Sequence, residues 1–256
     1  MNGVEKTAVG VAWLRARESE RSDRLFDDPY ASAFVAAAGH PGGGPGLFGD
    51  HLAFRTRFFD DYLRESGRTQ VVLLAAGLDS RAYRLEWAPG TRLFELDLPE
   101  LLTFKDGVLA DLGVTPACER VAVPVDLRED WPGALRAAGF DPARPTAWLV
   151  EGLLIYLSAA EAAGLLDQVG TLSAPGSRLA FEHDPAAAAR LMDRARTMPE
   201  LRRVATLWKG GLGEDAAPWL EARGWRTRVW ARAELAARYD RHARSGGAFL
   251  SAERTG

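Results

Sequence analysis

The chain has 256 residues, of which 47% are hydrophobic and 26% charged, and its formal net charge is −3. This composition is ordinary for a folded domain, and it lacks the basic footprint of a nucleic-acid-binding protein. There is no run of about 18 apolar residues that could span a membrane, and the N-terminus is charged throughout, unlike a signal peptide. The one cysteine, Cys118, cannot form an internal disulfide. We therefore expect a cytoplasmic protein that binds neither nucleic acid nor membrane.

The first quarter of the chain predicts helices. Apolar residues recur at helical spacing in residues 7–20 and 51–66. Asp28 and Pro29 are typical of an N-cap and a first helical residue, so we expect a helix from there to about Ala38. Three N-terminal helices are therefore predicted.

The glycine-rich stretch 39–49 (GHPGGGPGLFG) separates the second of these helices from the third. Its glycines and prolines are typical of a flexible loop, and a lid over a ligand is one interpretation. We assign residues 1–66 to a helical cap or lid on a core of residues 67–256. Both parts are expected to belong to one domain that spans residues 1–256.

From residue 70 onward, short apolar runs alternate with helical patterns. The first run, Gln70–Leu74 (QVVLL), is typical of a buried parallel strand. This alternation predicts an α/β fold with a doubly wound, mostly parallel sheet of seven strands. The strands are expected at 70–74, 92–96, 120–125, 147–149, 178–181, 225–229 and 247–251, with helices from 99, 131, 158, 185 and 231.

Distinctive residues follow the first four predicted strands. In doubly wound sheets, ligands bind outside the carboxyl ends of the strands. Small residues ending in Gly77 follow the first strand, where they allow a tight turn and a close approach to a ligand. Acids follow the next three strands: Asp97 (20 residues after Gly77), Asp126 (with Leu127 behind it) and Glu151. An acid placed like Asp97 can accept hydrogen bonds from two ribose hydroxyls.

Three carboxylates in one crevice are a poor cradle for a pyrophosphate, because they would repel it. They suit a cationic, adenosine-like ligand, and S-adenosylmethionine has this chemistry. The turn at Gly77 also lacks the complete G-x-G-x-x-G pattern of dinucleotide sites. A nicotinamide- or flavin-linked oxidoreductase stays as an alternative.

Six motifs carry a family resemblance: Leu25–Tyr30, Arg55–Asp61, Gln70–Leu85, Phe94–Pro99, Val125–Trp131 and Glu151–Leu157. They resemble the leucine carboxyl methyltransferase family, and in particular its bacterial branch of S-adenosylmethionine-dependent, polyketide O-methyltransferase-like proteins. The resemblance covers residues 7 to about 251 and implies a Rossmann-like class I methyltransferase fold. The pair QVVLLAAGLDSRAYRL and EGLLIYL is highly specific.

The resemblance implies a role for each residue that follows a strand. Gly77 would lie against the methionine part of S-adenosylmethionine, and Asp97 would hold its ribose. Asp126, with the backbone of Leu127, would bind the adenine. Glu151 would border the methionine side.

Two arginines are further cofactor-binding candidates by resemblance. Arg55 is similar to the family arginine that pairs with the cofactor's carboxylate, and Arg15 to its basic N-terminal partner, although Arg17 competes for that place. A guanidinium can donate two parallel hydrogen bonds to a carboxylate. The family usually has glycine where Ala75 stands and threonine where Ser80 stands. Ala75 leaves open a non-methylating member that only binds the cofactor.

The expected reaction is methylation of an oxygen on a small-molecule acceptor. A carboxylate is already ionised near neutral pH, so the enzyme need only orient it and exclude water. A phenol or alcohol would need a general base, and the candidate is His183, with Glu182 or Asp184 as orienting partner. Residues 194–213, especially Trp208, are candidates for the acceptor pocket. No cluster with metal-ligand spacing is found, and the oligomeric state stays open.

Overall fold

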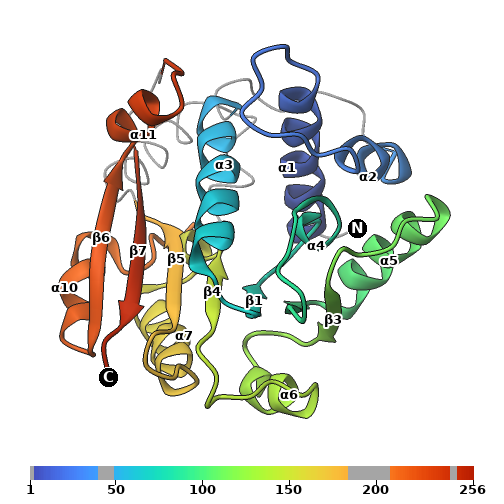
Figure 1. Cartoon of the computed structure of the whole chain (residues 1–256). Helices are drawn as coiled ribbons and strands as arrows, with labels where there is room; N and C mark the ends of the chain where they lie inside the picture. Colours follow the sequence, from blue (N-terminus) through green and yellow to red (C-terminus); the bar gives the residue numbers. More distant parts are fainter. Residues whose placement is uncertain (1–2, 40–48, 184–207, 243–246) are drawn as a thin grey trace. The chain divides into compact units, whose positions relative to one another are not determined.

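The computed structural model describes residues 3–39, 49–183, 208–242 and 247–256. They form two compact units, residues 1–140 and 141–256, and each unit carries part of a seven-stranded mixed sheet (Figure 1). The strand order is β3-β2-β1 in the first unit and β4-β5-β7-β6 in the second.

The first unit holds three parallel strands. They are β1 (Gln70–Leu74), β2 (Arg92–Asp97) and β3 (Glu119–Pro124), and β2 pairs with both of the others. All five residues of β1 are buried, as an apolar parallel strand should be. The helices of this part are α4 (Arg81–Arg84), α5 (Pro99–Asp111) and α6 (Trp131–Ala137). As predicted, α5 and α6 begin at residues 99 and 131.

Three helices precede the sheet: α1 (Gly3–Ser19), α2 (Ala31–Ala37) and α3 (Gly49–Ser66). The predicted start of α2 at Asp28-Pro29 is wrong, because the helix begins at Ala31. The Asp28 carboxylate accepts the Tyr30 N–H at 3.2 Å and pairs with Arg15 of α1 at 2.8 Å. The two oxygens of Asp28 thus make one local bond, to Tyr30, and one tertiary ion pair, with Arg15.

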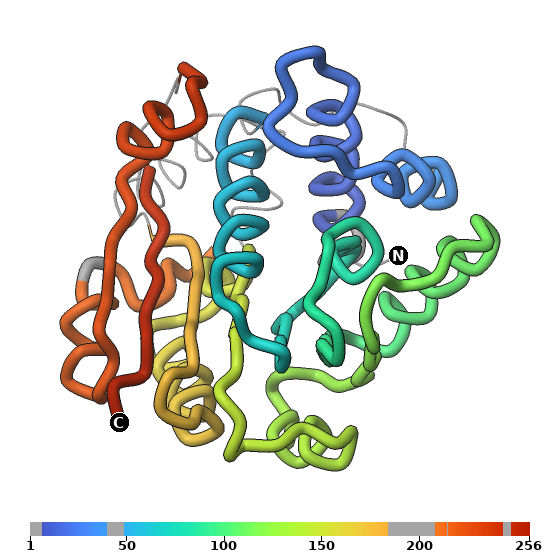
Figure 2. The backbone as a smooth tube through the Cα atoms, in the orientation of Figure 1, coloured from blue at the N-terminus to red at the C-terminus, as the bar shows by residue number. Residues whose placement is uncertain are grey.

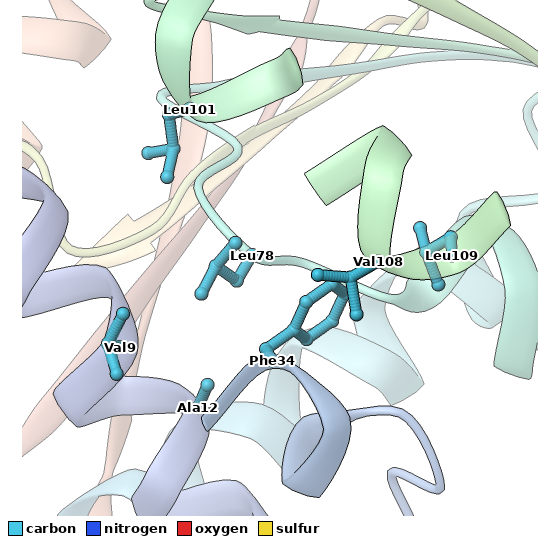
Figure 3. Close-up of a cluster of buried hydrophobic side chains, with 7 residues drawn as sticks. All are labelled: Val9, Ala12, Phe34, Leu78, Leu101, Val108 and Leu109. Atoms are coloured by element: carbon cyan, nitrogen blue, oxygen red, sulfur yellow. The ribbon is translucent and has the colours of Figure 1, made fainter. Parts of the chain in front are cut away.

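A cluster of buried apolar side chains joins α1 and α2 to the turn after β1 and to α5 (Figure 3). Burying a side chain of the size of Leu, Val or Phe contributes about 1.5–3 kcal/mol. The N-terminal helices therefore pack directly on the residues that follow the first strand. The cluster consists of Val9, Ala12, Phe34, Leu78, Leu101, Val108 and Leu109.

The second unit combines parallel and antiparallel pairing. β4 (Ala147–Val150) pairs with β5 (Arg178–Glu182) in parallel, whereas β7 (Ala248–Arg254) pairs antiparallel with both β5 and β6 (Trp225–Ala231). Figure 2 shows β6 and β7 running side by side near the C-terminus. The other elements are η2 (Leu154–Tyr156), α7 (Ala159–Thr171), η3 (Gly213–Asp215), α10 (Ala216–Glu221) and α11 (Arg232–Arg238).

The seven predicted strands are confirmed, each within a few residues of its predicted bounds. The capping box at the start of α7 is also present, since the side chains of Ser158 and Glu161 each accept the other residue's backbone N–H. The helix predicted from residue 185 and most of the glycine-rich stretch, residues 40–48, lie outside the described residues. Within the described ranges, no helix is long and apolar enough to cross a membrane.

Candidate functional site

The turn after β1 contains two residues in the left-handed conformation. Ala75 has φ 54° and Gly77 has φ 52°. The turn is fixed from the neighbouring strand, because the Ala76 N–H donates to the carbonyl oxygen of Leu96 at 3.0 Å. Glycine adopts this conformation freely, but for an L-residue such as alanine it is strained. Ala75 therefore keeps the backbone of a glycine turn in spite of its methyl group.

Asp97, the last residue of β2, fixes the same turn through its carboxylate. Oδ2 accepts the Gly77 N–H at 2.6 Å, and Oδ1 accepts the Leu98 N–H at 2.7 Å. Burial raises the pKa of Asp97 above its usual value, against the opposing effect of these two N–H groups. Each oxygen of a carboxylate has about two acceptor positions, so each keeps one beyond these bonds. Asp97 is thus a buried, oriented acceptor that suits two ribose hydroxyls.

Asp126 lies just beyond β3 and is paired with an exposed arginine. Arg128 donates to both carboxylate oxygens, with Nε at 2.9 and 3.0 Å, and its backbone N–H also donates to Oδ1. The side-chain bond from Arg128 lowers the pKa of Asp126. Because the Arg128 side chain is 85% exposed, the pair is open to solvent and weak. A donor such as an adenine amine can therefore exchange with it, and the half-buried Leu127 lies beside it.

Arg15 and Arg55 are both buried in the first unit. Nε of Arg15 pairs with Asp28 at 2.8 Å, and its Nη2 donates to the carbonyl oxygen of Leu78. Through Nε and Nη2, Arg15 links α1 to Asp28 and to the turn after β1. Its third nitrogen, Nη1, takes no part in these two contacts. The competing Arg17 is exposed and lies over the ring of Trp13. A role for Arg15 or Arg55 toward a cofactor carboxylate stays a prediction.

A buried ion network, which the sequence analysis missed, joins α3 to α4. Asp60 of α3 accepts from Nε of Arg81 at 2.7 Å and from both terminal nitrogens of Arg84, at 2.6 and 2.7 Å. Arg81 also pairs with Asp79. Burial opposes ionisation of Asp79, but the charges of Arg81, Lys105, Arg15 and Arg84 together outweigh it, and the pKa falls to about 2. The chain after Gly77 is therefore fixed to a neighbouring helix.

A second buried charge cluster lies at Glu95, two residues before Asp97 on β2. The Glu95 side chain is fully buried, and its Oε2 lies 2.7 Å from Nζ of Lys105 and 2.8 Å from Arg120. Lys105 is fully buried as well. A buried charge of this kind stays ionised only when an opposite charge lies close to it. The cluster joins β2, β3 and α5 just before Asp97.

In the second unit, Glu151 and Gly152 follow β4. Gly152 has φ 68°, and its N–H donates to the carboxylate of Glu182, the last residue of β5, at 2.5 Å. His183 is half-buried, and its backbone N–H donates to the carbonyl oxygen of Ala248 at 3.1 Å. Asp184, its other predicted partner, lies outside the described residues.

The region proposed for the acceptor pocket is described only from Trp208 onward. Trp208 is half-buried and precedes Lys209, whose backbone N–H donates to the carbonyl oxygen of Ile155 at 2.7 Å. Residues 208–211 therefore run beside the motif Glu151–Leu157, while residues 194–207 lie outside the described part of the chain. A pocket lined by Trp208 stays a prediction.

We expect Ala75→Gly to stabilise the protein. Releasing an L-residue from the left-handed region regains about 1–2 kcal/mol, against about 0.5–1 kcal/mol for the added flexibility of glycine. The net gain should be roughly 0.5–1 kcal/mol in urea unfolding. Ala76→Gly is the matched control, since Ala76 is buried and is not in the left-handed region, and it should destabilise. A loss of stability in Ala75→Gly would contradict the strain argument.

The fold and the turns after the strands define the class of protein. Two solved structures have a similar fold. A Thermobifida fusca YX protein, described provisionally as a methyltransferase, is 19% identical and aligns with a TM-score of 0.60 over 95% of this chain and 94% of that one. The magnesium protoporphyrin IX methyltransferase of Synechocystis PCC 6803, solved with bound SAH, is 14% identical with a TM-score of 0.54 over 88% and 93%. The chain therefore has the class I methyltransferase fold.

Sequence comparison gives the family. The sequence model of the leucine carboxyl methyltransferase family matches residues 8–170. A Frankia alni protein, named provisionally as an S-adenosyl-L-methionine-dependent methyltransferase, is 55% identical over 94% of this chain and 90% of its own length. A relative from Mycobacterium sp. (strain KMS) with the same provisional name is 43% identical over 94% and 89%. The chain belongs to the leucine carboxyl methyltransferase family, a family of S-adenosylmethionine-dependent methyltransferases.

Proposed function

We propose that this protein is an O-methyltransferase that methylates a carboxylate of a small-molecule acceptor with S-adenosylmethionine. The observation that carries the proposal is the geometry of Asp97. Its carboxylate is buried, oriented by the N–H groups of Gly77 and Leu98, and keeps acceptor positions on both oxygens. These acceptor positions fit the two ribose hydroxyls of the cofactor. The sulfonium of the cofactor supplies the electrophilic methyl group.

The other predicted cofactor contacts belong to the same proposal. Asp126 and the Leu127 backbone would bind the adenine, and Gly77 and Glu151 would border the methionine part. Arg55 and Arg15 would pair with the cofactor's carboxylate. Every acid in this set favours a cationic ligand, since the ammonium and the sulfonium are both positive.

Two considerations support a carboxylate as the acceptor. The matching family is described as leucine carboxyl methyltransferases. In addition, a carboxylate needs no general base, so the protein need only orient it and keep water away. His183 is the base that a phenol or alcohol would require. In the structure, Oε2 of its predicted partner Glu182 accepts the Gly152 N–H.

His183→Gln separates the two acceptor classes. We first screen carboxylic and phenolic acceptors with S-adenosylmethionine that carries a tritiated methyl group. With a carboxylate acceptor, His183→Gln should leave the rate within a few-fold, and the pH–rate profile should show no rising limb near pH 6–7. Loss of a general base from a hydroxyl methyltransferase would slow turnover by about a hundredfold or more.

The folded state and the cofactor affinity of His183→Gln serve as controls, measured by thermal unfolding and by calorimetry. If the rate collapses while both are intact, the carboxylate proposal is wrong and His183 is the base of a hydroxyl methyltransferase. If wild type binds the cofactor but methylates no acceptor of either class, a non-methylating, cofactor-binding member becomes the better account.

A further inference from the structure

The two units contain the same hydrogen-bonded arrangement after their first parallel strand. In the first unit, Gly77 follows β1 in the left-handed conformation and donates its N–H to Asp97, the last residue of the paired strand β2, at 2.6 Å. In the second unit, Gly152 follows β4 with φ 68° and donates to Glu182, the last residue of the paired strand β5, at 2.5 Å. In both places a carboxylate at the end of one strand fixes the glycine turn of its neighbour.

The strand register explains why Glu182 reaches Gly152. Val150, the last residue of β4, is paired with Phe181. The residue after Val150 therefore begins the turn, and the residue after Phe181, Glu182, ends β5. Glu182 itself is paired with Phe249 of β7, and the N–H of His183 donates to Ala248. The Glu182 backbone is thus held in the sheet, and its carboxylate is a fixed acceptor.

The segment beyond this turn is held by a different set of bonds. The N–H groups of Lys209 and Gly211 donate to the carbonyl oxygens of Ile155 and Leu157, at 2.7 and 2.9 Å. These bonds fix the far end of Glu151–Leu157, whereas the Glu182 bond fixes its beginning. Because glycine is the most flexible residue, the direction of the chain at Gly152 depends on this bond, and so does the placement of Glu151 next to it.

We propose that Glu182 is a positioning residue for the cofactor: its carboxylate holds Gly152 and thereby sets Glu151 against the methionine part of S-adenosylmethionine. This inference rests on the proposed function. A charged acceptor makes a stronger bond than a neutral one, which suits a turn that must stay in one conformation. Glu182 acts through Glu151 and has no assigned role toward the adenosine part.

The test is calorimetry on the full chain with three ligands: S-adenosylmethionine, its demethylated product and adenosine. In Glu182→Ala, we expect both methionine-containing ligands to bind about tenfold more weakly, a change of about 1.4 kcal/mol. Adenosine should bind as to wild type, because the bonds that hold Asp97 and Asp126 do not involve Glu182. Glu182→Gln keeps an acceptor oxygen at the same reach and should restore binding to within a few-fold.

Glu253→Ala is the matched control, since Glu253 lies on β7 and forms an exposed pair with Arg226, and it should change no affinity. If Glu182→Ala does not fold, Glu182→Asp retains the charge but withdraws it from Gly152, and it should show the same selective loss. The inference is overturned if the substituted protein binds S-adenosylmethionine like wild type, if adenosine weakens equally, or if Glu182→Gln loses as much as Glu182→Ala. Failure of wild type itself to bind S-adenosylmethionine would instead reject the proposed function.

Discussion

Replacing Asp60 with alanine is expected to lower the free energy of unfolding by about 3–5 kcal/mol, because removing one partner leaves buried charges uncompensated. Asp60 is 1% exposed and binds both Arg81 and Arg84. Arg81 retains Asp79, but Arg84 loses the carboxylate that accepts from both of its terminal nitrogens. Burial opposes the ionised form of Asp60, yet the two guanidinium groups lower its pKa below the usual value.

Urea unfolding of wild type, Asp60→Ala and Asp23→Ala measures this effect. Asp23 also pairs with an arginine, Arg21, but both side chains are largely exposed, so its loss should change stability by less than about 1 kcal/mol. A loss of similar size in the two variants would show that the buried network does not hold α3 to α4.

Much of the sheet could be predicted from the sequence because its strands are short and apolar. Gln70–Leu74 is buried at every position. A short continuous apolar run is typical of a buried parallel strand in an α/β fold. Local chemistry also marked helix starts correctly, as the capping box of Ser158 and Glu161 shows. The start of α2 was predicted less well: Asp28 accepts the Tyr30 N–H and also pairs with Arg15 of an earlier helix, and α2 begins at Ala31.

Bonds between distant residues could not be predicted from spacing alone. Asp60 and Arg81 lie on different elements, and no local pattern relates them. Gly77 and Asp97 were predicted as two separate ligand contacts, whereas the structure joins them by a hydrogen bond. From the sequence, Glu182 is expected only as a partner of His183; in the structure one of its carboxylate oxygens accepts the Gly152 N–H.

Asp97→Ala is expected to weaken S-adenosylmethionine binding by roughly ten- to hundredfold. Hydrogen bonds to a charged acceptor typically contribute about 1.5–3 kcal/mol, and two ribose hydroxyls would lose theirs. The structure adds a second reason, because the same carboxylate holds the N–H groups of Gly77 and Leu98. Its loss would therefore also loosen the turn against which the cofactor is proposed to lie.

The most direct test is calorimetric titration of S-adenosylmethionine into wild type, Asp97→Ala and Asp111→Ala. Asp111, at the exposed end of α5, is the control for loss of an acid without loss of the site. All three proteins should be folded by circular dichroism before titration. The account predicts tight binding to wild type and Asp111→Ala and a roughly ten- to hundredfold loss in Asp97→Ala. Unchanged affinity in a folded Asp97→Ala protein would contradict the assignment of Asp97 as the ribose-binding residue.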